Sequence, residues 1–258
     1  MKKVLTIAGS DCSGGAGIQA DLKAMSEFKC YGMSVITALT AQNTTGVFAV
    51  ENCSVDFVSK QLDAVFSDIF PDAVKIGMVS SEAIIDEISS FLGKNNVKNL
   101  VLDPVMVSTS GSRLLEENAI KSLKEKLIPL ATLITPNIYE AEILASMEIN
   151  DEKDVYLAID KIKDYYEGSI LIKGGHIKDN CNDYLYIDGK VEVFPGKMID
   201  NPNTHGTGCT LSSAIASNLA LGNSISDSVG ISKDYITRAI AYGLDLGNGR
   251  GPLNHHLR

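Results

Sequence analysis

The sequence has little positive charge for its length. Its 258 residues include 23 Lys and Arg against 32 Asp and Glu, a formal net charge of -9. No basic face is visible that could meet a phosphate backbone, so nucleic acid is not expected as a main partner. A small phosphorylated ligand remains compatible with this charge, because it needs only a local positive pocket.

Cysteine, long apolar runs and linkers are scarce as well. The five Cys residues are widely spaced, without a CxxC pair or a signal peptide, which favours free thiols in a reducing cytoplasm. No apolar run approaches the ~20 residues of a membrane span. With 45% hydrophobic and 21% charged residues and no repeats, the composition suits one α/β domain over residues 1–258. We expect a cytoplasmic protein that does not cross a membrane.

Short apolar runs alternate with segments of helical periodicity. Strands are predicted at Lys3–Ala8, Val35–Leu39, Ala73–Ile76, Asn99–Leu102, Thr132–Ile134 and Ser169–Ile172. The helices predicted between and after them cover residues 18–28, 54–66, 81–92, 118–127, 138–147, 155–165 and 229–242. This order predicts a mostly parallel sheet with helices on both faces. Asp188-Gly189, between two further short strands, predicts a β-hairpin.

Polar groups recur directly after the predicted strands. They are Asp11, Gln42, Gly77 with Met78, Asp103, Asn137 with Glu140, and Lys173. Ligands of parallel α/β sheets bind beyond these strand ends, so we expect all of these groups to face one crevice. A solvated loop explains any single member, but it explains less well why they recur at the same topological position.

The stretch over residues 203–210 (NTHGTGCT) is a second candidate site. It opens a predicted helix over Leu211–Leu221, and Gly222 stands where a C-cap glycine belongs. Its glycines allow close backbone approach, and the free N–H groups of the first helical turn favour an anion, most naturally a phosphate. The same field favours a thiolate at Cys209. The alternative is an ordinary glycine turn into a buried helix, with Cys209 as a core residue.

These groups together suggest phosphoryl transfer, which needs charge neutralisation and alignment. Asp103 and Glu140 are candidate Mg²⁺ ligands, directly or through water. Lys173 is a candidate for neutralising phosphate oxygens, and the amides of Gly206–Cys209 for holding the charge of the transferred group. Cys209, or a water that it orders, is the candidate base. The plainer alternatives are a surface lysine at a strand end and a turn aspartate before a proline.

Other motifs are missing or incomplete. The absence of GxxxxGK[ST] excludes a P-loop kinase. Residues 15–20 match the dinucleotide fingerprint GxGxxA, but the preceding loop is too long and no acidic residue ends the next predicted strand. The four His lack a metal-ligand spacing such as HExxH. His205, beside the anion loop, is expected at most to shape that loop.

The chain resembles the ribokinase-like superfamily and, within it, the hydroxymethylpyrimidine/phosphomethylpyrimidine kinases of thiamine biosynthesis. The resemblance covers essentially the whole length, and its most specific segments are residues 8–21 (AGSDCSGGAGIQAD) and 203–215 (NTHGTGCTLSSAI). It also includes residues 37–44 (TALTAQNT), 75–79 (KIGMV), 102–111 (LDPVMVSTSG), 135–140 (TPNIYE), 173–176 (KGGH) and 251–255 (GPLNH).

The resemblance implies a single-domain three-layer sandwich, with a central, mostly parallel sheet, helices on both faces and a small hairpin or flap at the edge. It implies two ATP-dependent, Mg²⁺-assisted steps in one site. The first phosphorylates the hydroxymethyl group of 4-amino-5-hydroxymethyl-2-methylpyrimidine, and the second converts the monophosphate to the diphosphate. Because relatives are often dimers, it also suggests a homodimer.

The resemblance assigns residues to the two halves of the site. Gln42 matches the residue that reads the pyrimidine edge. The other residues matched or grouped with substrate binding are Ala16, Met78, Val105 and Asp11. On the phosphate side, the matched or grouped residues are Asp103 and Glu140 for Mg²⁺, Lys173 for phosphate, Gly206, Gly208 and Cys209 for the anion hole and base, and Asn137, Thr207 and Lys233 for further nucleotide or phosphate contacts.

The substrate stays open between two vitamins. Relatives with Cys in the anion loop also phosphorylate vitamin B6 compounds, and a thiol can add reversibly to the aldehyde of pyridoxal. The runner-up is therefore a pyridoxal/pyridoxine kinase or an enzyme that does both, although Gln42 and Met78 favour the pyrimidine. A non-catalytic nucleotide- or vitamin-binding protein is a third reading, which the presence of every candidate catalytic residue disfavours.

Two departures from the family pattern stand beside the candidate loops. Asp200-Asn201-Pro202 replaces an Asp-Thr-x segment that is common before the Asn-Thr-His triplet, which puts the local nucleotide contacts in question. Cys12 replaces a common Ser, and no disulfide is inferred from it.

Overall fold

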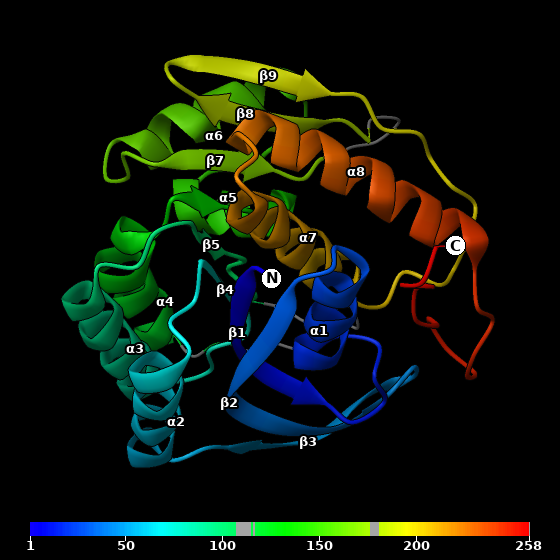
Figure 1. Cartoon of the computed structure of the whole chain (residues 1–258). Coiled ribbons are helices and arrows are strands. Elements are labelled where there is room, and N and C mark those ends of the chain that lie inside the picture. Colours follow the sequence, from blue (N-terminus) through cyan, green and yellow to red (C-terminus); the bar gives the residue numbers. More distant parts are fainter. Residues whose placement is uncertain (107–114, 116, 176–180, 258) are drawn as a thin grey trace.

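One sheet of nine strands runs through the computed structural model, which describes residues 1–106, 115, 117–175 and 181–257 (Figure 1). The strand order is β3-β2-β1-β4-β5-β6-β7-β8-β9. All neighbours from β2 to β7 pair in parallel, whereas β3, β8 and β9 add antiparallel edges. The strands are β1 (Lys3–Asp11), β2 (Tyr31–Asn43), β3 (Gly46–Asn52), β4 (Ala73–Ile76), β5 (Leu100–Leu102), β6 (Leu133–Ile134), β7 (Ser169–Ile172), β8 (Asp183–Ile187) and β9 (Lys190–Phe194).

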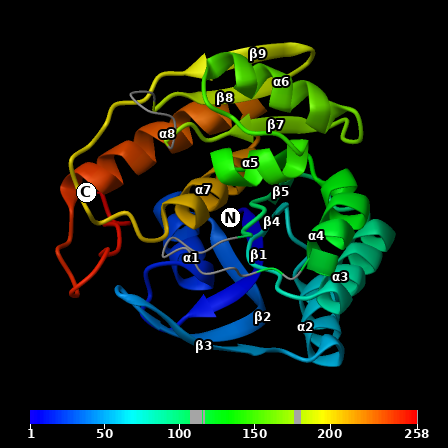
Figure 2. The same ribbon diagram turned by 180° about the vertical axis from the view of Figure 1, so that it is seen from behind.

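Helices cover both faces of the sheet, as predicted (Figures 1 and 2). One layer contains α1 (Gly17–Glu27), α7 (Thr207–Leu221) and α8 (Ile225–Tyr242). The other contains α2 (Val55–Asp68), α3 (Glu82–Asn95), α4 (Glu117–Ser122), α5 (Ile138–Ala145) and α6 (Glu152–Lys163), with a π turn, η1 (Leu123–Leu127), and a 3₁₀ turn, η2 (Ile128–Leu130), after α4.

Strand alternation divides the core between the two layers. Val4 packs with the α1, α7 and α8 layer, whereas Leu5 and Ile7 pack with the other layer. This follows from the two-residue period of a strand, whose successive side chains point to opposite faces. The parallel strands are therefore apolar on both sides, which is why they read as continuous hydrophobic runs in the sequence.

Local residues explain several helix ends and turns, and the signals predicted at Gly222 and Asp188-Gly189 are confirmed. Ser54 and Ser81 cap α2 and α3 by accepting hydrogen bonds from backbone N–H groups three residues ahead. Helix α7 ends at Gly222 with a φ of 97°, a left-handed conformation that favours glycine. Asp188 and Gly189 both have positive φ in the β8–β9 hairpin.

The β2–β3 region differs from the prediction. Strand β2 (Tyr31–Asn43) extends beyond both ends of the strand predicted at Val35–Leu39, and β3 was not predicted at all. Strand β3 is mostly exposed, and Phe48 keeps 69% of its surface in solvent. Without a buried face the strand shows no apolar alternation, so its pairing with β2 is the main feature that holds it.

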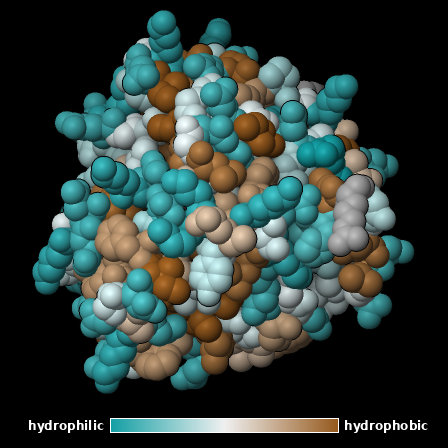
Figure 3. Space-filling view, viewed as in Figure 1, coloured by the Kyte–Doolittle hydropathy of each residue, from teal (hydrophilic) through white to brown (hydrophobic). Residues whose placement is uncertain are grey.

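The surface and the thiols bear on the environment of the protein. Hydrophobic and hydrophilic residues are interspersed over the face in Figure 3. Among the helices that the structure describes, none is long and apolar enough to cross a bilayer. All five cysteines are free thiols.

Candidate active site

An ion pair from two strand ends lies against the N-terminus of α7. Lys173, after β7, places its Nζ 2.8 Å from Oδ1 of Asp103, after β5. Thr135 and Ser212 also donate to Asp103, at 3.2 and 3.4 Å. A Cβ on Gly208 would stand 3.3 Å from Asp103 Oδ2 and 3.5 Å from Lys173 Nζ. The structure thus brings three sequence-predicted residues together, because the strand ends and the helix start share one edge of the sheet.

The anion loop also packs on the first glycine loop. Gly206 precedes α7 with a φ of 85°, and a Cβ there would overlap the carbonyl oxygen of Gly15. Thr207 donates its Oγ1 to Thr204 O at 2.7 Å, so its hydroxyl closes the loop itself. The N–H groups of Gly208 and Cys209 lie in the first turn, where no helical carbonyl precedes them. They are available to a bound anion.

The expected thiolate at Cys209 is contradicted. Burial raises the pKa of this thiol to about 11, although the Lys75 charge and a hydrogen bond from the Gly17 backbone N–H lower it. The negative charges of Asp21 and Asp103 add to the effect of burial. Burial therefore outweighs the groups that favour a thiolate, and Cys209 is a neutral thiol at pH 7.

Asn137 and Glu140 hold each other at the start of α5. The Asn137 side chain accepts from the Glu140 backbone N–H at 3.0 Å, and Glu140 Oε2 accepts from the Asn137 N–H at 2.8 Å. This capping box was not recognised in the sequence, although its Asn-x-x-Glu spacing carries the signal. Burial raises the pKa of Glu140, the Lys173 charge lowers it, and the Asp103 charge raises it. Glu140 is thus a carboxyl group whose charge depends on its cationic neighbours.

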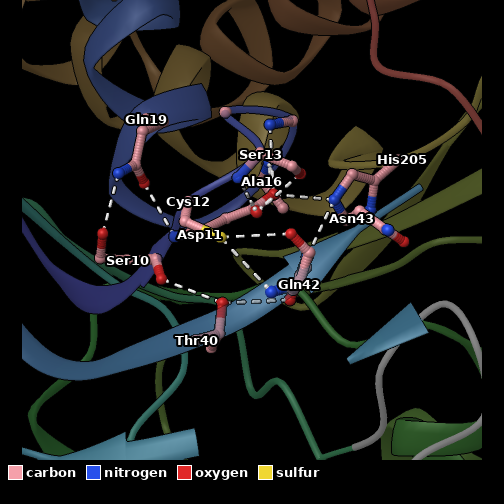
Figure 4. A network of polar contacts seen from close by, with 12 residues as sticks. Ser10, Asp11, Cys12, Ser13, Ala16, Gln19, Thr40, Gln42, Asn43 and His205 are labelled. Atoms are coloured by element: carbon pink, nitrogen blue, oxygen red, sulfur yellow. Dashed lines mark hydrogen bonds and ion pairs between the residues drawn. The ribbon is translucent and has the colours of Figure 1, made fainter. Parts of the chain in front are cut away.

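The candidate substrate side is a hydrogen-bonded network at the ends of β1 and β2 (Figure 4). Asp11 accepts from the backbone N–H groups of Ser13, Gly15 and Ala16, which folds the glycine loop around its carboxylate. Burial opposes this charge, but hydrogen bonds from His205, Ser13 and Ala16 lower the pKa of Asp11 to about 2. Asp11 is therefore ionised at neutral pH.

Three further candidates line this region or its border. The Gln42 amide lies between Thr40 and His205. The Met78 sulfur would be 3.3 Å from a Cβ on Gly9, at the end of β1. Val105 stands two residues after Asp103 and donates its N–H to the Asp103 carbonyl oxygen at 2.8 Å.

Lys233 is not brought to the ion pair at Gly208. Its Nζ lies 2.6 Å from Asp183 Oδ2 and 3.3 Å from the carbonyl oxygen of Cys181. Asp183 in turn accepts from the N–H of Gly174, next to Lys173. The expected phosphate contact would require Lys233 to leave this pairing, so in this structure it supports the loop after β7.

The structure also locates other features noted in the sequence. Asn201 lies in the segment 200–202 that differs from the family pattern. Its side-chain amide donates to Ile240 O at 2.6 Å and so holds this segment against α8. The segment 107–111 and His176 lie outside the described residues. Sequence reasoning missed the wholly buried Lys75–Asp21 pair and the position of His205. A lysine inside the apolar strand AVKI was the available signal for the first.

Residues 11–254 match the model of the phosphomethylpyrimidine kinase family. This chain belongs to that family. The kinase is 48% identical to the hydroxymethylpyrimidine/phosphomethylpyrimidine kinase of Rhizobium meliloti (strain 1021), over 98% of this chain and 97% of the relative.

Solved structures agree with this assignment. The crystal structure of phosphomethylpyrimidine kinase from Clostridium difficile 630 shares 51% identity and a TM-score of 0.84, covering 93% of this chain and 100% of that one. An ADP complex of Bacillus subtilis pyridoxal kinase shares 38% identity and a TM-score of 0.91, over 99% and 97% of the two chains. The chain is a phosphotransferase with the ribokinase-like fold.

Proposed function

We propose that this kinase transfers the γ-phosphoryl group of ATP to 4-amino-5-hydroxymethyl-2-methylpyrimidine, and then a second phosphoryl group to the resulting monophosphate, for thiamine biosynthesis. The observation that carries the proposal is the meeting of Asp103, Lys173 and Gly208. A carboxylate, a cation and free N–H groups at one point are what aligning and neutralising a transferring phosphoryl group requires. The relatives named for this pyrimidine support the choice of substrate.

Mg²⁺ belongs to the proposal, with Asp103 and Glu140 as its protein ligands, direct or through water. The described part of the chain has no cluster of three or more His, Cys, Asp or Glu that would enclose a metal ion. Two carboxylates fit an ion that keeps several waters and binds chiefly to the nucleotide phosphates. When bound, Mg²⁺ supplies charge neutralisation to those phosphates.

The remaining roles follow from the contacts on the phosphate side. Lys173 exchanges part of its interaction with Asp103 for phosphate oxygens, and the N–H groups of Gly208 and Cys209 hold the developing negative charge. The thiolate form of Cys209 takes up the proton of the acceptor hydroxyl, directly or through a water, and becomes the neutral thiol. Its raised pKa leaves little thiolate at neutral pH but makes that thiolate a stronger proton acceptor.

The test is ATP consumption by the purified protein with Mg²⁺, with hydroxymethylpyrimidine and pyridoxal offered in parallel and the products separated by charge. A diphosphate of the pyrimidine is the expected result. Asp103→Asn should lower the rate about a hundredfold or more, whereas the exposed Asp160→Asn serves as the matched control. Failure of the wild-type protein to phosphorylate either compound would overturn the proposal.

Pyridoxal kinase activity is the second candidate, alone or beside the first. The Cys209 thiol favours it, because a thiol adds reversibly to an aldehyde, and the Bacillus subtilis pyridoxal kinase is a near structural neighbour. Phosphate on pyridoxal alone would replace the pyrimidine assignment. Comparison of pyridoxal with pyridoxine, which lacks the aldehyde, then measures what the thiol contributes.

We also propose that the chain forms a homodimer in the cytoplasm. The exposed apolar residues Phe48 and Val50, on one face of the edge strand β3, support an association surface there. Sedimentation equilibrium of the wild-type protein and of Phe48→Asp should give a dimer and a weakened dimer, respectively. A monomeric wild-type protein would contradict this part of the proposal.

A further inference from the structure

Gln42 is enclosed by side chains that restrict how its amide can point (Figure 4). His205 Nε2 lies 3.0 Å from one end of the amide, and Thr40 Oγ1 lies 3.3 Å from the other. His205 Nε2 also lies 2.8 Å from Asp11 Oδ2, and Thr40 Oγ1 lies 3.0 Å from the carbonyl oxygen of Ser10. Each neighbour of the amide therefore has a second partner.

Those second partners decide which neighbour donates. The Asp11 carboxylate is ionised and can only accept, so the proton on this bond belongs to His205 Nε2. The Ser10 carbonyl oxygen can likewise only accept, so Thr40 directs its single hydroxyl proton there. Toward Gln42, His205 thus presents an N–H, while Thr40 presents a lone pair.

Only one of the two amide orientations satisfies both neighbours. In the first orientation, Gln42 Nε2 faces His205 Nε2, so that two donors meet. Gln42 Oε1 then faces Thr40, whose only hydroxyl proton is already donated to Ser10 O. Rotation by 180° about the last side-chain bond removes both conflicts. The His205 proton is then shared between Asp11 and Gln42 Oε1, and Gln42 Nε2 donates to Thr40. An amide assignment of this kind follows from the network, since the two ends have nearly the same shape.

We propose that His205, held by Asp11, fixes the Gln42 amide with Oε1 toward the anion loop and Nε2 toward Thr40, and so sets the hydrogen-bond pattern that the substrate ring must present. His205 is a positioning residue in this scheme. The inference rests on the proposed function, because it concerns how the substrate of that reaction is chosen.

The fixed amide selects a ring edge of one polarity. One Nε2–H and one lone pair of Oε1 remain for a ligand, which must offer an acceptor on the Thr40 side and a donor on the His205 side. The edge of a 4-aminopyrimidine has this order, a ring nitrogen followed by an exocyclic amine. Its hydroxymethyl group is the next substituent and then lies on the side of Gly206–Cys209. Pyridoxal has no such adjacent pair.

The backbone supports the position of His205. The ring packs where a Cβ on Gly15 would be, so glycine is needed at that position. The His205 N–H donates to Gly251 O at 3.1 Å, and its side chain is only 12% exposed. Asp11 is fixed by the N–H groups of its own loop. The orientation is thus set before substrate arrives, which reduces the cost of ordering on binding.

The first test is the protonation of His205 in the wild-type protein. Long-range ¹H–¹⁵N spectra distinguish a protonated from a bare ring nitrogen, and loss of one signal set in His205→Asn assigns the residue. We expect a protonated Nε2 near neutral pH in the free protein. A bare Nε2 would overturn the proposal, because the Gln42 amide would then have to donate to it.

The second test measures recognition of the amine. Dissociation constants are determined by calorimetry for hydroxymethylpyrimidine and for its analogue without the 4-amino group. In the wild-type protein the amine should strengthen binding about tenfold or more. His205→Asn, whose amide nitrogen stands at the Nδ1 position, should lose most of that ratio, and His205→Gln, which places a donor near Nε2, should restore it.

The measurements distinguish failure of the positioning role of His205 from failure of the proposed function. The control for loss of an imidazole is His256→Asn. His256 is exposed and contacts only the carboxylate of Glu27 among the ion pairs of the described residues, away from Gln42. An amine ratio that is the same in wild type and His205→Asn would overturn the positioning role. Absence of any binding of the pyrimidine to wild-type protein would instead overturn the proposed function, while the ring-nitrogen spectra would still test the orientation of Gln42.

Discussion

Neighbouring serines of α7 contact two lysine–aspartate pairs of opposite character. Ser213 donates to Asp21, whose partner Lys75 comes from β4, and neither charged side chain has any exposed surface. Ser212 donates to Asp103, whose partner Lys173 keeps 16% of its side chain exposed. The same two residue types thus form a sealed pair within the fold and an accessible pair at the site.

The difference lies in how fully each pair is satisfied. Asp21 accepts from Lys75 with both oxygens at 2.9 Å, and also from Thr6 and Ser213 at 2.6 and 2.7 Å. Burial would lower the pKa of Lys75, but the charges of Asp21 and Asp103 and the hydrogen bond to Asp21 together raise it. The Lys75–Asp21 pair, whose carboxylate has several donors and no contact with solvent, therefore links β1, α1, β4 and α7. Lys173 is instead partly exposed, so that a bound phosphate can contact its ammonium group.

The largest expected effect is loss of stability in Lys75→Met. Removing the cation leaves Asp21 buried without a counter-charge, so the free energy of unfolding should fall by about 3–5 kcal/mol in urea denaturation. The double variant Asp21→Asn/Lys75→Met should recover part of this loss. A double variant as unstable as the single one would show that packing, rather than charge, dominates here.

Lys173→Met should separate activity from stability. We expect kcat/KM to fall about 10²–10³-fold, because a cation at the transferring group is lost. The free energy of unfolding should change by only about 1 kcal/mol, since the Lys173 side chain is partly exposed and water can take its place beside Asp103, which no water can do at the sealed Lys75–Asp21 pair. Steady-state kinetics and urea unfolding on one preparation check both. A loss of stability equal to that of Lys75→Met would erase the distinction between the two pairs.

Cys209 reports on both pairs, because Lys75 lowers its pKa while Asp21 and Asp103 raise it. With the pKa at about 11, thiolate is the minor form at neutral pH and increases as the pH rises. Alkylation of Cys209 should therefore accelerate about a hundredfold between pH 7 and pH 9. Site-resolved mass spectrometry measures the rate, and Cys209→Ser is the control. A plateau below pH 9 would contradict the raised pKa.

The smallest contrast is between the two serines. Ser213→Ala removes a 2.7 Å bond to a buried carboxylate and should cost about 1–2 kcal/mol of unfolding free energy. Ser212→Ala should cost less than about 1 kcal/mol, because its contact with Asp103 is 3.4 Å and its shorter bonds go to helix carbonyl oxygens. Equal losses in urea unfolding would count against the saturation argument.

Much of the fold could be predicted where local signals and burial agree. Strands β4 and β7 have their predicted bounds because each is a short apolar run between polar loop residues. Strand β3 could not be found, because its exposed side chains carry no period and its partner β2 supplies the pairing. Lys75 within β4 likewise gave no sign of its partner, which is 54 residues away in sequence.

The site was predicted in part for a topological reason. The rule that ligands bind at the ends of parallel strands pointed to Asp103 and Lys173, and the structure brings both to Gly208. Lys233, which the family resemblance and not this rule suggested, lies on a helix and pairs with Asp183. The thiolate expected at Cys209 was wrong, because burial raises the pKa of this thiol and the sequence does not show how deeply the thiol is buried.

The sequence by itself determined the alternation of the parallel strands with helices, the glycine-rich anion loop and the family. These depend on periodicity, turn residues and motifs that are local in the chain. Only the tertiary structure decided which charges are sealed and which stay accessible, and which way the Gln42 amide points. Burial and hydrogen-bond direction depend on partners such as His205 and Asp11, which are 194 residues apart in sequence and adjacent only after folding.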